Sequence, residues 1–519
     1  MLKMVDGTGI IGVDMVCPLG ATVSPPQPPN YDNIEMEGIG SLMLPNSLKA
    51  PLERLELIGN SVQGENPAPD NPQEIKSVGR KSSNLLIENI SVFTVRDNIA
   101  YIPLPEGHET KLYTMLIQKK PGENDDVGFT CGFYDKANMT ATYSTPCLKD
   151  GNLVTTNGVV NSKVGVNHFI CFSPADSKFF DIYNVMYVEG KETALDYEPY
   201  GYFFDVKVTG KNLFNKELIK KAMQGVSYLY VPIYVKKGSK VSFSYSKTLP
   251  SGLNFYVLLA RDMGASYGSY SWLYHSTATS LCNNEGTFVA DNDVISLSFF
   301  GSDLDIMIEN LFNYLQIEIS DKPTPYEPYT EQTVQIALDE PLRGIVRIND
   351  GKNVQEALNS SGITRRFKEV EITKDTLITY TLGQYGAPET NTVLCRYKDA
   401  SLKKTGAILC GELKNINNWA KEEESVTMTE QGIDFRLSRE RLGLGSDTTP
   451  EENKVAVIKY LTEHPLHCVA ELNAPTTEPL PESVQAQLSS LHSENGTTHI
   501  NIDSGEVEAG IKLTYRKEI

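Results

Sequence analysis

The chain contains one long segment twice, and this repeat constrains the fold more than any other feature. Asn184–Tyr200 reads NVMYVEGKETALDYEPY and Asn313–Tyr329 reads NYLQIEISDKPTPYEPY, so both copies close on Tyr-Glu-Pro-Tyr. The phrase Asn84-Leu85-Leu86 recurs as Asn212-Leu213-Phe214. The start and the end of the unit are displaced by nearly the same length, about 130 residues, whereas solenoid repeats run only ~20–50 residues. The repeat therefore indicates two copies of one domain.

Short strand-like runs separated by turn residues fill both copies. Tyr113–Ile117 lies in the first copy, and Tyr228–Val235 and Val241–Tyr245 lie in the second. Such spacing is typical of antiparallel sandwiches, and a unit of ~120 residues has the length that an eight-stranded jelly roll needs. We predict a mainly β protein with tandem antiparallel jelly-roll sandwich modules at 84–205 and 206–331.

The last third of the chain mixes helix and strand signals. Thr449–Glu452 has the pattern of a capping box with proline at the first helical position, and apolar residues at helical spacing follow it as far as His464. A second helix is expected over Glu482–Leu491, and a hairpin-like pair of strands over Thr497–Ile502 and Ile511–Tyr515. These signals predict a C-terminal α+β domain.

Composition and charge exclude several classes of partner. The 519 residues include 47 Lys and Arg against 66 Asp and Glu, a net charge of −19, which disfavours contact with nucleic acid. No window approaches the ~20 apolar residues of a membrane span, so we expect no membrane insertion. The eight cysteines are scattered without a Cys-x-x-Cys pair, which predicts free and mostly buried thiols.

No enzyme motif stands out. The chain lacks a Gly-x-Ser-x-Gly elbow, a Walker loop and a His-Glu-x-x-His pair. His464, His467 and Cys468 lie close in sequence, but Pro465 separates a predicted helix end from a strand, so we expect no metal site there. We predict a protein that is not an enzyme and needs no cofactor or metal, with no catalytic residue assigned.

One aromatic segment is the candidate carbohydrate-binding site. Tyr267, Tyr270, Trp272 and Tyr274 lie among serines and a glycine in the second module. Flat rings can stack on the apolar face of a sugar while hydroxyl groups bond to its hydroxyls. The alternative is that Tyr270, Trp272 and Tyr274, which alternate with period two, form the inward face of a strand.

Several phrases together resemble tail-tip and baseplate proteins of phages and prophages of Gram-positive and gut bacteria. They are the loop Gly59–Pro72, the opening Gly210–Phe214, the two Tyr-Glu-Pro-Tyr closings, the phrase Leu338–Gly344 and the stretch Val457–Leu472. The resemblance implies a virion structural protein of a tail, baseplate or fibre that contributes to binding a host-surface glycan. It also implies a homotrimer that is assembled into the virion in the bacterial host cytoplasm.

Two other functions remain open at this point. The chain could be a carbohydrate-binding or polysaccharide-degrading protein that acts on glycans, or a fibre on a capsid surface.

The virion hypothesis also gives the N-terminal segment a role in attachment. Residues 1–50 are rich in glycine and carry few strand or helix signals, yet they are too apolar for a free tail. We expect this segment to become ordered against other virion tail or capsid proteins, and a truncation that begins near Pro51 to stay folded.

The predicted organisation therefore has six parts. They are an attachment segment with a Pro-rich spacer (1–50), a strand and rigid loop connector (51–83), jelly-roll module 1 (84–205), jelly-roll module 2 (206–331), a connector (332–367) and the C-terminal α+β domain (368–519).

Overall fold

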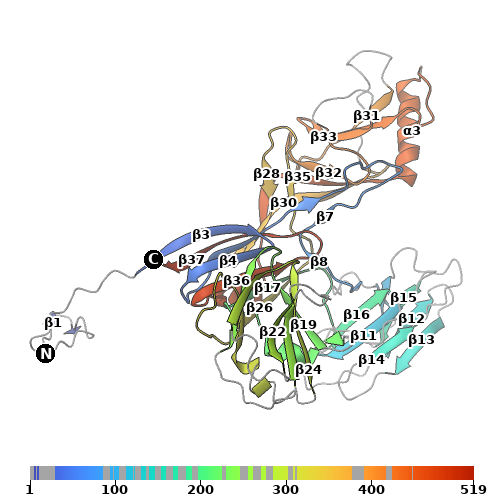
Figure 1. The fold of residues 1–519 in the computed structure, drawn as a ribbon. Coiled ribbons are helices and arrows are strands. Elements are labelled where there is room, and N and C mark those ends of the chain that lie inside the picture. Colours follow the sequence, from blue (N-terminus) through green and yellow to red (C-terminus); the bar gives the residue numbers. More distant parts are fainter. Residues whose placement is uncertain are drawn as a thin grey trace, which may run out of the picture.

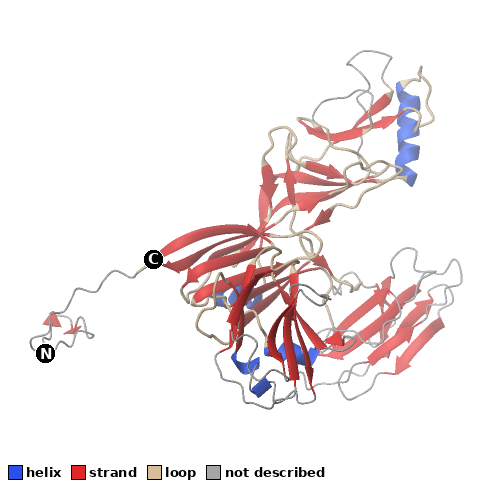
Figure 2. Ribbon diagram, in the orientation of Figure 1, coloured by secondary structure: helices blue, strands red, loops and turns tan. Residues whose placement is uncertain are grey.

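The computed structural model shows a mainly β protein (Figures 1 and 2). It describes residues 5–6, 9–10, 30–85, 94–96, 99–103, 113–120, 122, 130–135, 140–146, 154–158, 168–173, 183–189, 197–221, 223–224, 229–245, 255–260, 270–275, 285–301, 308–309, 312–376, 391–416, 423–446 and 448–519. The antiparallel, strand-rich fold class predicted from the sequence is confirmed.

A central β-structure, here called the hub, holds the molecule together. Its strands come from four separated parts of the chain: β3 (Tyr31–Ile39), β4 (Ser41–Ser47), β5 (Glu53–Ile58), β17 (Tyr202–Thr209), β26 (Glu331–Leu338), β36 (Gly496–Asp503) and β37 (Gly510–Glu518). They follow the order β26-β17-β36-β4-β3-β37-β5. The sheet turns sharply at Gly40, which has a φ of +67°, and β3 and β4 share only the pair Ile39–Ser41. The two halves therefore enclose one hydrophobic core.

Both ends of the chain build this hub, which differs from the sequence expectation. β3 pairs along its whole length with β37, and β4 pairs with β36. Residues 31–47 are thus ordered by the chain itself, because Leu42 and Leu44 are buried in the hub core. The hairpin expected across Gly505 is also wrong: β36 and β37 do not pair with each other, since β4 and β3 lie between them.

The two modules are jelly-roll sandwiches with the same strand order. Each has a five-stranded and a three-stranded sheet, in which the strands, numbered along the module, follow the orders 5-4-7-2-1 and 6-3-8. Module 1 contains β9 (Thr94–Arg96), β10 (Ile99–Pro103), β11 (Tyr113–Lys119), β12 (Thr130–Asp135), β13 (Thr140–Pro146), β14 (Val154–Gly158), β15 (His168–Ser173) and β16 (Tyr183–Glu189). Module 2 contains β18 (Met223–Gln224), β19 (Leu229–Tyr234), β20 (Lys240–Tyr245), β21 (Phe255–Ala260), β22 (Tyr270–His275), β23 (Glu285–Val289), β24 (Val294–Gly301) and β25 (Leu315–Ile319), with the short 3-10 helices η3 (Lys216–Lys221) and η4 (Phe312–Tyr314). The identical order supports the duplication inferred from the sequence.

Both modules are insertions into the hub. Strand β8 (Arg80–Lys81), which leads into module 1, pairs with the start of β17, so module 1 leaves and rejoins the hub at one place. Module 2 lies between the end of β17 and the start of β26, where Thr209 and Glu331 are paired. The two attachment points are therefore separated by the length of β17, roughly 25 Å for eight residues.

The C-terminal domain extends the same sheet. It contains β29 (Ala357–Asn359), β30 (Gly362–Ile372), β35 (Leu466–Glu478) and β32 (Ile408–Cys410), a second sheet of β31 (Thr392–Tyr397), β34 (Gly432–Ser438) and β33 (Ser425–Thr429), and helix α3 (Pro450–Glu463). The predicted capping box of α3 is present: the Thr449 side chain accepts from the N–H of Glu452, and the Glu452 side chain accepts from that of Thr449. Helix α4 (Glu482–Ser490) buries Leu488 in the hub core. The segment from α4 onward thus belongs to the hub and not to the C-terminal domain.

Short strands line the connections between the hub and the C-terminal domain. The hairpin of β27 (Gly344–Val346) and β28 (Asn353–Gln355) leads into β29, and β6 (Ser61–Val62) pairs with β7 (Lys76–Ser77). Near the start of the chain, β1 (Val5–Asp6) pairs with β2 (Gly9–Ile10). Among the helices in the described part of the chain, none is long and apolar enough to cross a membrane.

Candidate functional site

The aromatic segment of module 2 lies on an edge strand. β22 carries Tyr270, Trp272 and Tyr274, whereas Tyr267 lies outside the described residues. β22 is the last strand of the five-stranded sheet and pairs with β21. The register shifts between Trp272 and Tyr274, which leaves Leu273 without an opposite residue. A bulge of this kind interrupts regular alternation and re-aims side chains, and bulges are frequent at sheet edges and binding sites.

A buried asparagine fastens module 2 to its own closing phrase. Asn212 Nδ2 donates hydrogen bonds to the carbonyl oxygens of Leu315 (3.1 Å) and Glu327 (3.0 Å). Its Oδ1 accepts from the N–H groups of Phe214 (3.1 Å) and Ile317 (3.1 Å). Three of these bonds join the entry of the module to its last strand and to Tyr-Glu-Pro-Tyr, and the bond from Phe214 lies within the entry itself.

Module 1 has the equivalent arrangement. Asn84 Nδ2 donates to the carbonyl oxygens of Val185 (3.4 Å) and Glu198 (2.9 Å). Val185 lies in the last strand of module 1, and Glu198 is the glutamate of the first Tyr-Glu-Pro-Tyr. We call this shared arrangement the clasp. In both modules, therefore, the repeated asparagine forms a hydrogen bond with the repeated closing phrase.

Each clasp also contains an ion pair, although the cation comes from a different position. Glu198 pairs with Arg80 at 2.7 Å, and Glu327 pairs with Lys211 at 2.8 Å. Burial opposes the charge of Arg80, but the hydrogen bond and the charge of Glu198 raise its pKa. The asparagine and the glutamate anchor the closing phrase.

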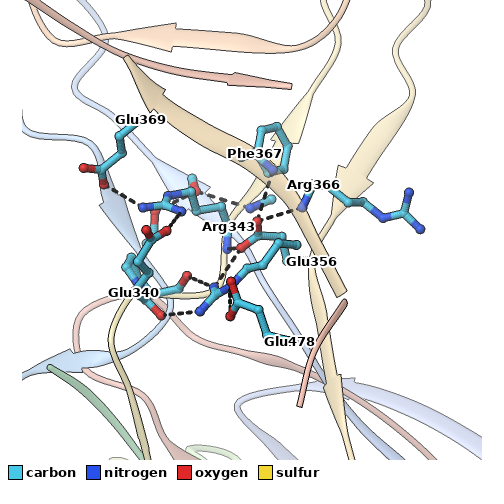
Figure 3. Close-up of polar contacts among 12 residues, drawn as sticks. Glu340, Arg343, Glu356, Arg366, Phe367, Glu369 and Glu478 are labelled. Atoms are coloured by element: carbon cyan, nitrogen blue, oxygen red, sulfur yellow. Dashed lines mark hydrogen bonds and ion pairs between the residues drawn. The ribbon is translucent and has the colours of Figure 1, made fainter. Parts of the chain in front are cut away.

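A second polar cluster joins the hub to the C-terminal domain (Figure 3). The carboxylate of Glu356 is fully buried, and its Oε1 accepts from the N–H groups of Arg366 (2.9 Å) and Phe367 (3.1 Å). Its Oε2 accepts from the N–H of Arg343 (2.9 Å) and from Nη1 of Arg365 (3.2 Å). The register of β30 with β35 shifts between Arg365 and Phe367, so Arg366 is not paired with a residue of β35. Glu356 satisfies the amides left at this irregularity.

Two arginines complete this cluster. The buried Arg343 pairs with Glu340 (2.7 Å) and Glu369 (2.6 Å), and Nε of Arg365 bonds to Glu478 (2.9 Å). Burial disfavours the charged form of Arg343, but the Glu340 hydrogen bond and the surrounding carboxylates raise its pKa. Residues 338–344, one of the phrases quoted in the sequence analysis, therefore meet β30 at a junction. There Arg343, from the phrase, and Arg365, from β30, are each held by several acceptors. These hydrogen bonds and ion pairs hold the hub and the C-terminal domain together.

The loop Gly59–Pro72, another of those phrases, packs directly on this junction. A Cβ on Gly59 would lie 2.5 Å from the carbonyl oxygen of Arg343, and one on Gly344 would lie 2.3 Å from that of Gly59. Only glycine allows such a close approach of two backbones. Farther along, Asp70 forms a bidentate pair with Arg441 at 2.6 and 2.9 Å. The loop fastens the hub to the C-terminal domain.

A cleft of about 620 Å³ lies between residues 72–75, which follow this loop, and the C-terminal domain. Ile75, Glu371, Gly411, Glu412 and His467 are among its lining residues. His467 Nδ1 is 2.9 Å from Glu412 Oε1, and His467 Nε2 is 3.5 Å from Glu371 Oε1. Its volume is in the range of small-molecule sites, and its lining combines carboxylates and an imidazole with apolar residues.

The three residues considered as metal ligands do not converge. His464 ends helix α3, where its N–H donates to the carbonyl oxygen of Tyr460 (2.9 Å) and its ring lies against the tyrosine ring. His467 faces the cleft, and Cys468 is buried in the C-terminal core. Across the residues that the structure describes, no three His, Cys, Asp or Glu side chains are placed to hold a metal ion. Cys395, Cys410 and Cys468 are free and buried, as predicted for the thiols.

The fold and these contacts define a mainly β, modular protein. No protein-family model matches the chain, and no curated protein matches it significantly. Among solved structures, one similar chain comes from the structure of the Macrobrachium rosenbergii nodavirus. The two chains are 12% identical, and the match covers 64% of this chain and 98% of that one with a TM-score of 0.13. A TM-score this low carries no argument about fold or function.

Proposed function

We propose that this chain is a virion structural protein of a bacteriophage tail, baseplate or fibre, and that module 2 contributes to binding a host-surface glycan. The observation that carries the proposal is the insertion of two jelly rolls of identical strand order into one hub through the same clasp. A hub that displays repeated modules at fixed points suits a protein that builds a particle and contacts a surface. The resemblance of the 59–72, 210–214 and 338–344 phrases to phage tail proteins supports the same function.

The glycan contact is assigned to β22. Its three aromatic residues belong to a bulged edge strand, and both bulges and aromatic residues are frequent at binding sites. Trp272→Ala should weaken binding of the full-length protein to host cell-wall polysaccharide at least tenfold. Tyr234→Ala is the matched control, because Tyr234 is an aromatic residue of the same module that is 76% exposed and lies on β19.

Circular dichroism and thermal unfolding of both variants accompany the binding measurement. Unchanged unfolding with weaker binding supports the assignment. A core-type loss of ~3–5 kcal/mol for Trp272→Ala would show that this side chain packs inside the module and that the glycan binds elsewhere.

Particle location and enzymatic activity separate the proposal from its alternatives. Antibody labelling of purified particles should decorate the tail, and labelling of the capsid would instead indicate a capsid-surface fibre. Light scattering should give the mass of three copies of the 57.5 kDa chain. Incubation with polysaccharide should release no oligosaccharide. If release occurs and is abolished by Glu371→Gln or Glu412→Gln, the cleft beside His467 is a catalytic site and the protein is a depolymerase.

A further inference from the structure

We infer that the free edge of β3 is a docking site for a basic, extended segment of another protein. β3 spans nine residues and pairs with β37 throughout, but in the described part of the chain its other side is paired only at Ile39, beside the turn. A long strand edge with unpaired main-chain groups is a template for one more strand. The inference concerns a different surface from the proposed glycan site and does not rest on that function.

The register shows which main-chain groups face outward. The N–H of Ile519 donates to the carbonyl oxygen of Asn30, and that of Gly40 donates to Ala509. The β3–β37 register is regular between these two bonds, so even-numbered residues exchange hydrogen bonds with β37. The N–H and C=O groups of the odd-numbered residues, among them Asn33 and Glu35, therefore point to the free edge.

The side chains of β3 leave an apolar flank beside this edge. Ile34 and Met36 pack against the hub core but are only partly buried. A strand added to β3 would cover the open side of the core. By contrast, β26, the first strand in the sheet order, lies beside the chain that follows α4, where Gln332 exchanges two hydrogen bonds with His492.

Charge decides what kind of strand fits. Glu35 and Glu37 are exposed on the outer face of β3, and their partners are the exposed Arg54 (3.9 Å) and the half-buried Lys512 (3.1 Å). Antiparallel pairing of two β3 strands centred on Glu35 would place glutamate against glutamate, and like charges directly opposite are destabilising. A second copy of this chain is therefore disfavoured at this edge. Lysine or arginine at alternate positions, with apolar residues between them, matches both the glutamates and the apolar flank.

Synthetic strands test the site on the full-length protein. A fluorescent (Lys-Val)4 peptide should bind, with affinity that falls as salt rises, and a (Glu-Val)4 peptide should bind at least tenfold more weakly. The double variant Glu35→Lys/Glu37→Lys should reverse this preference without altering the β3 backbone. Equal binding of the lysine peptide to the wild type and to this variant would overturn the inference.

A proline variant distinguishes strand addition from simple charge attraction. Asn33→Pro removes an outward N–H and should reduce peptide binding at least tenfold while thermal unfolding changes little. Glu53→Gln, which removes an exposed carboxylate on β5, is the control for general charge. If Asn33→Pro binds the lysine peptide as the wild type does, the contact is not strand pairing and the docking site is not this edge. If (Lys-Val)4 does not bind the wild-type protein, the inference also fails.

Discussion

At the scale of single residues, the most informative side chains are buried polar ones that the sequence does not mark. Glu356 lies between β28 and β29, in a segment that the sequence marks only as a connector. The carboxylate accepts hydrogen bonds from three backbone N–H groups and from the guanidinium of Arg365. No local pattern predicts such a residue, because its partners lie on other segments.

Replacement of Glu356 tests this junction. Glu356→Gln removes the charge that Arg365 and the surrounding amides require, and breaking a buried pair costs ~3–5 kcal/mol. We expect a loss of about that size in the free energy of unfolding, measured by denaturant titration. Glu478→Gln is the matched control: it also contacts Arg365, but its side chain is 50% exposed, so the loss should stay below ~1 kcal/mol. Equal losses would mean that Glu356 has no special role.

His499 makes the stability of the hub dependent on pH. This residue of β36 is buried, its Nε2 has no hydrogen-bond partner among the described residues, and burial lowers its pKa to about 4. In the unfolded chain the pKa of this imidazole is about 6.5. Between pH 6.5 and pH 4 the unfolded chain therefore binds a proton that the folded chain does not, and this favours unfolding. Stability should be constant above pH 6.5 and fall by up to ~3 kcal/mol as the pH drops to 4. Unfolding of the wild type and His499→Gln from pH 7 to pH 4 checks this, and parallel curves would contradict it.

At the scale of elements, the sequence predicts where helices and strands form better than it predicts which strands pair with one another. The capping box places α3 correctly, and the strands Tyr113–Lys119 and Lys240–Tyr245 follow their predicted runs. The partners of β36 and β37 could not be predicted, because a period-two pattern defines the two faces of a strand and says nothing of its neighbours. The repeated asparagine was visible as part of a phrase, but its acceptors lie about 100 residues away.

The clasp gives a prediction for one module. In Asn212→Asp, a carboxylate faces the carbonyl oxygens of Leu315 and Glu327 and two donors are lost. Leaving these buried groups unsatisfied should cost ~2–3 kcal/mol. We expect faster hydrogen exchange in β25 while exchange in the hub strands stays unchanged. The exposed Asn292→Asp should have no effect, and similar exchange in both variants would show that the clasp does not stabilise the module.

At the scale of the whole molecule, the structure revises the role of the N-terminal segment. The sequence treats residues 1–50 as one attachment segment, whereas β3 and β4 are part of the hub. Their sequence signals are weak because each strand is completed by residues at least 449 positions away. Sequence periodicity cannot register such distant pairing.

Two truncations separate these roles. A chain that begins at Asn30 keeps β3 and β4 and should unfold at the same temperature as the full-length protein. A chain that begins at Pro51 loses Leu42 and Leu44 from the core, at ~2–3 kcal/mol each, together with two strands of the ladder. We expect it to be aggregated or largely unfolded in the hub by circular dichroism and size-exclusion chromatography. A well-folded, monodisperse protein from this second truncation would contradict the hub as described.

The pairing of β3 with β37 also fixes when the molecule can be completed during synthesis. β3 is made before both modules, but its partner β37 is made after every other described element. The jelly rolls, whose strands are close in sequence, can fold while translation continues, whereas the hub must wait for the last strands. A chain released early would carry folded modules on an open hub. Closure of the hub therefore requires that β37 has been made.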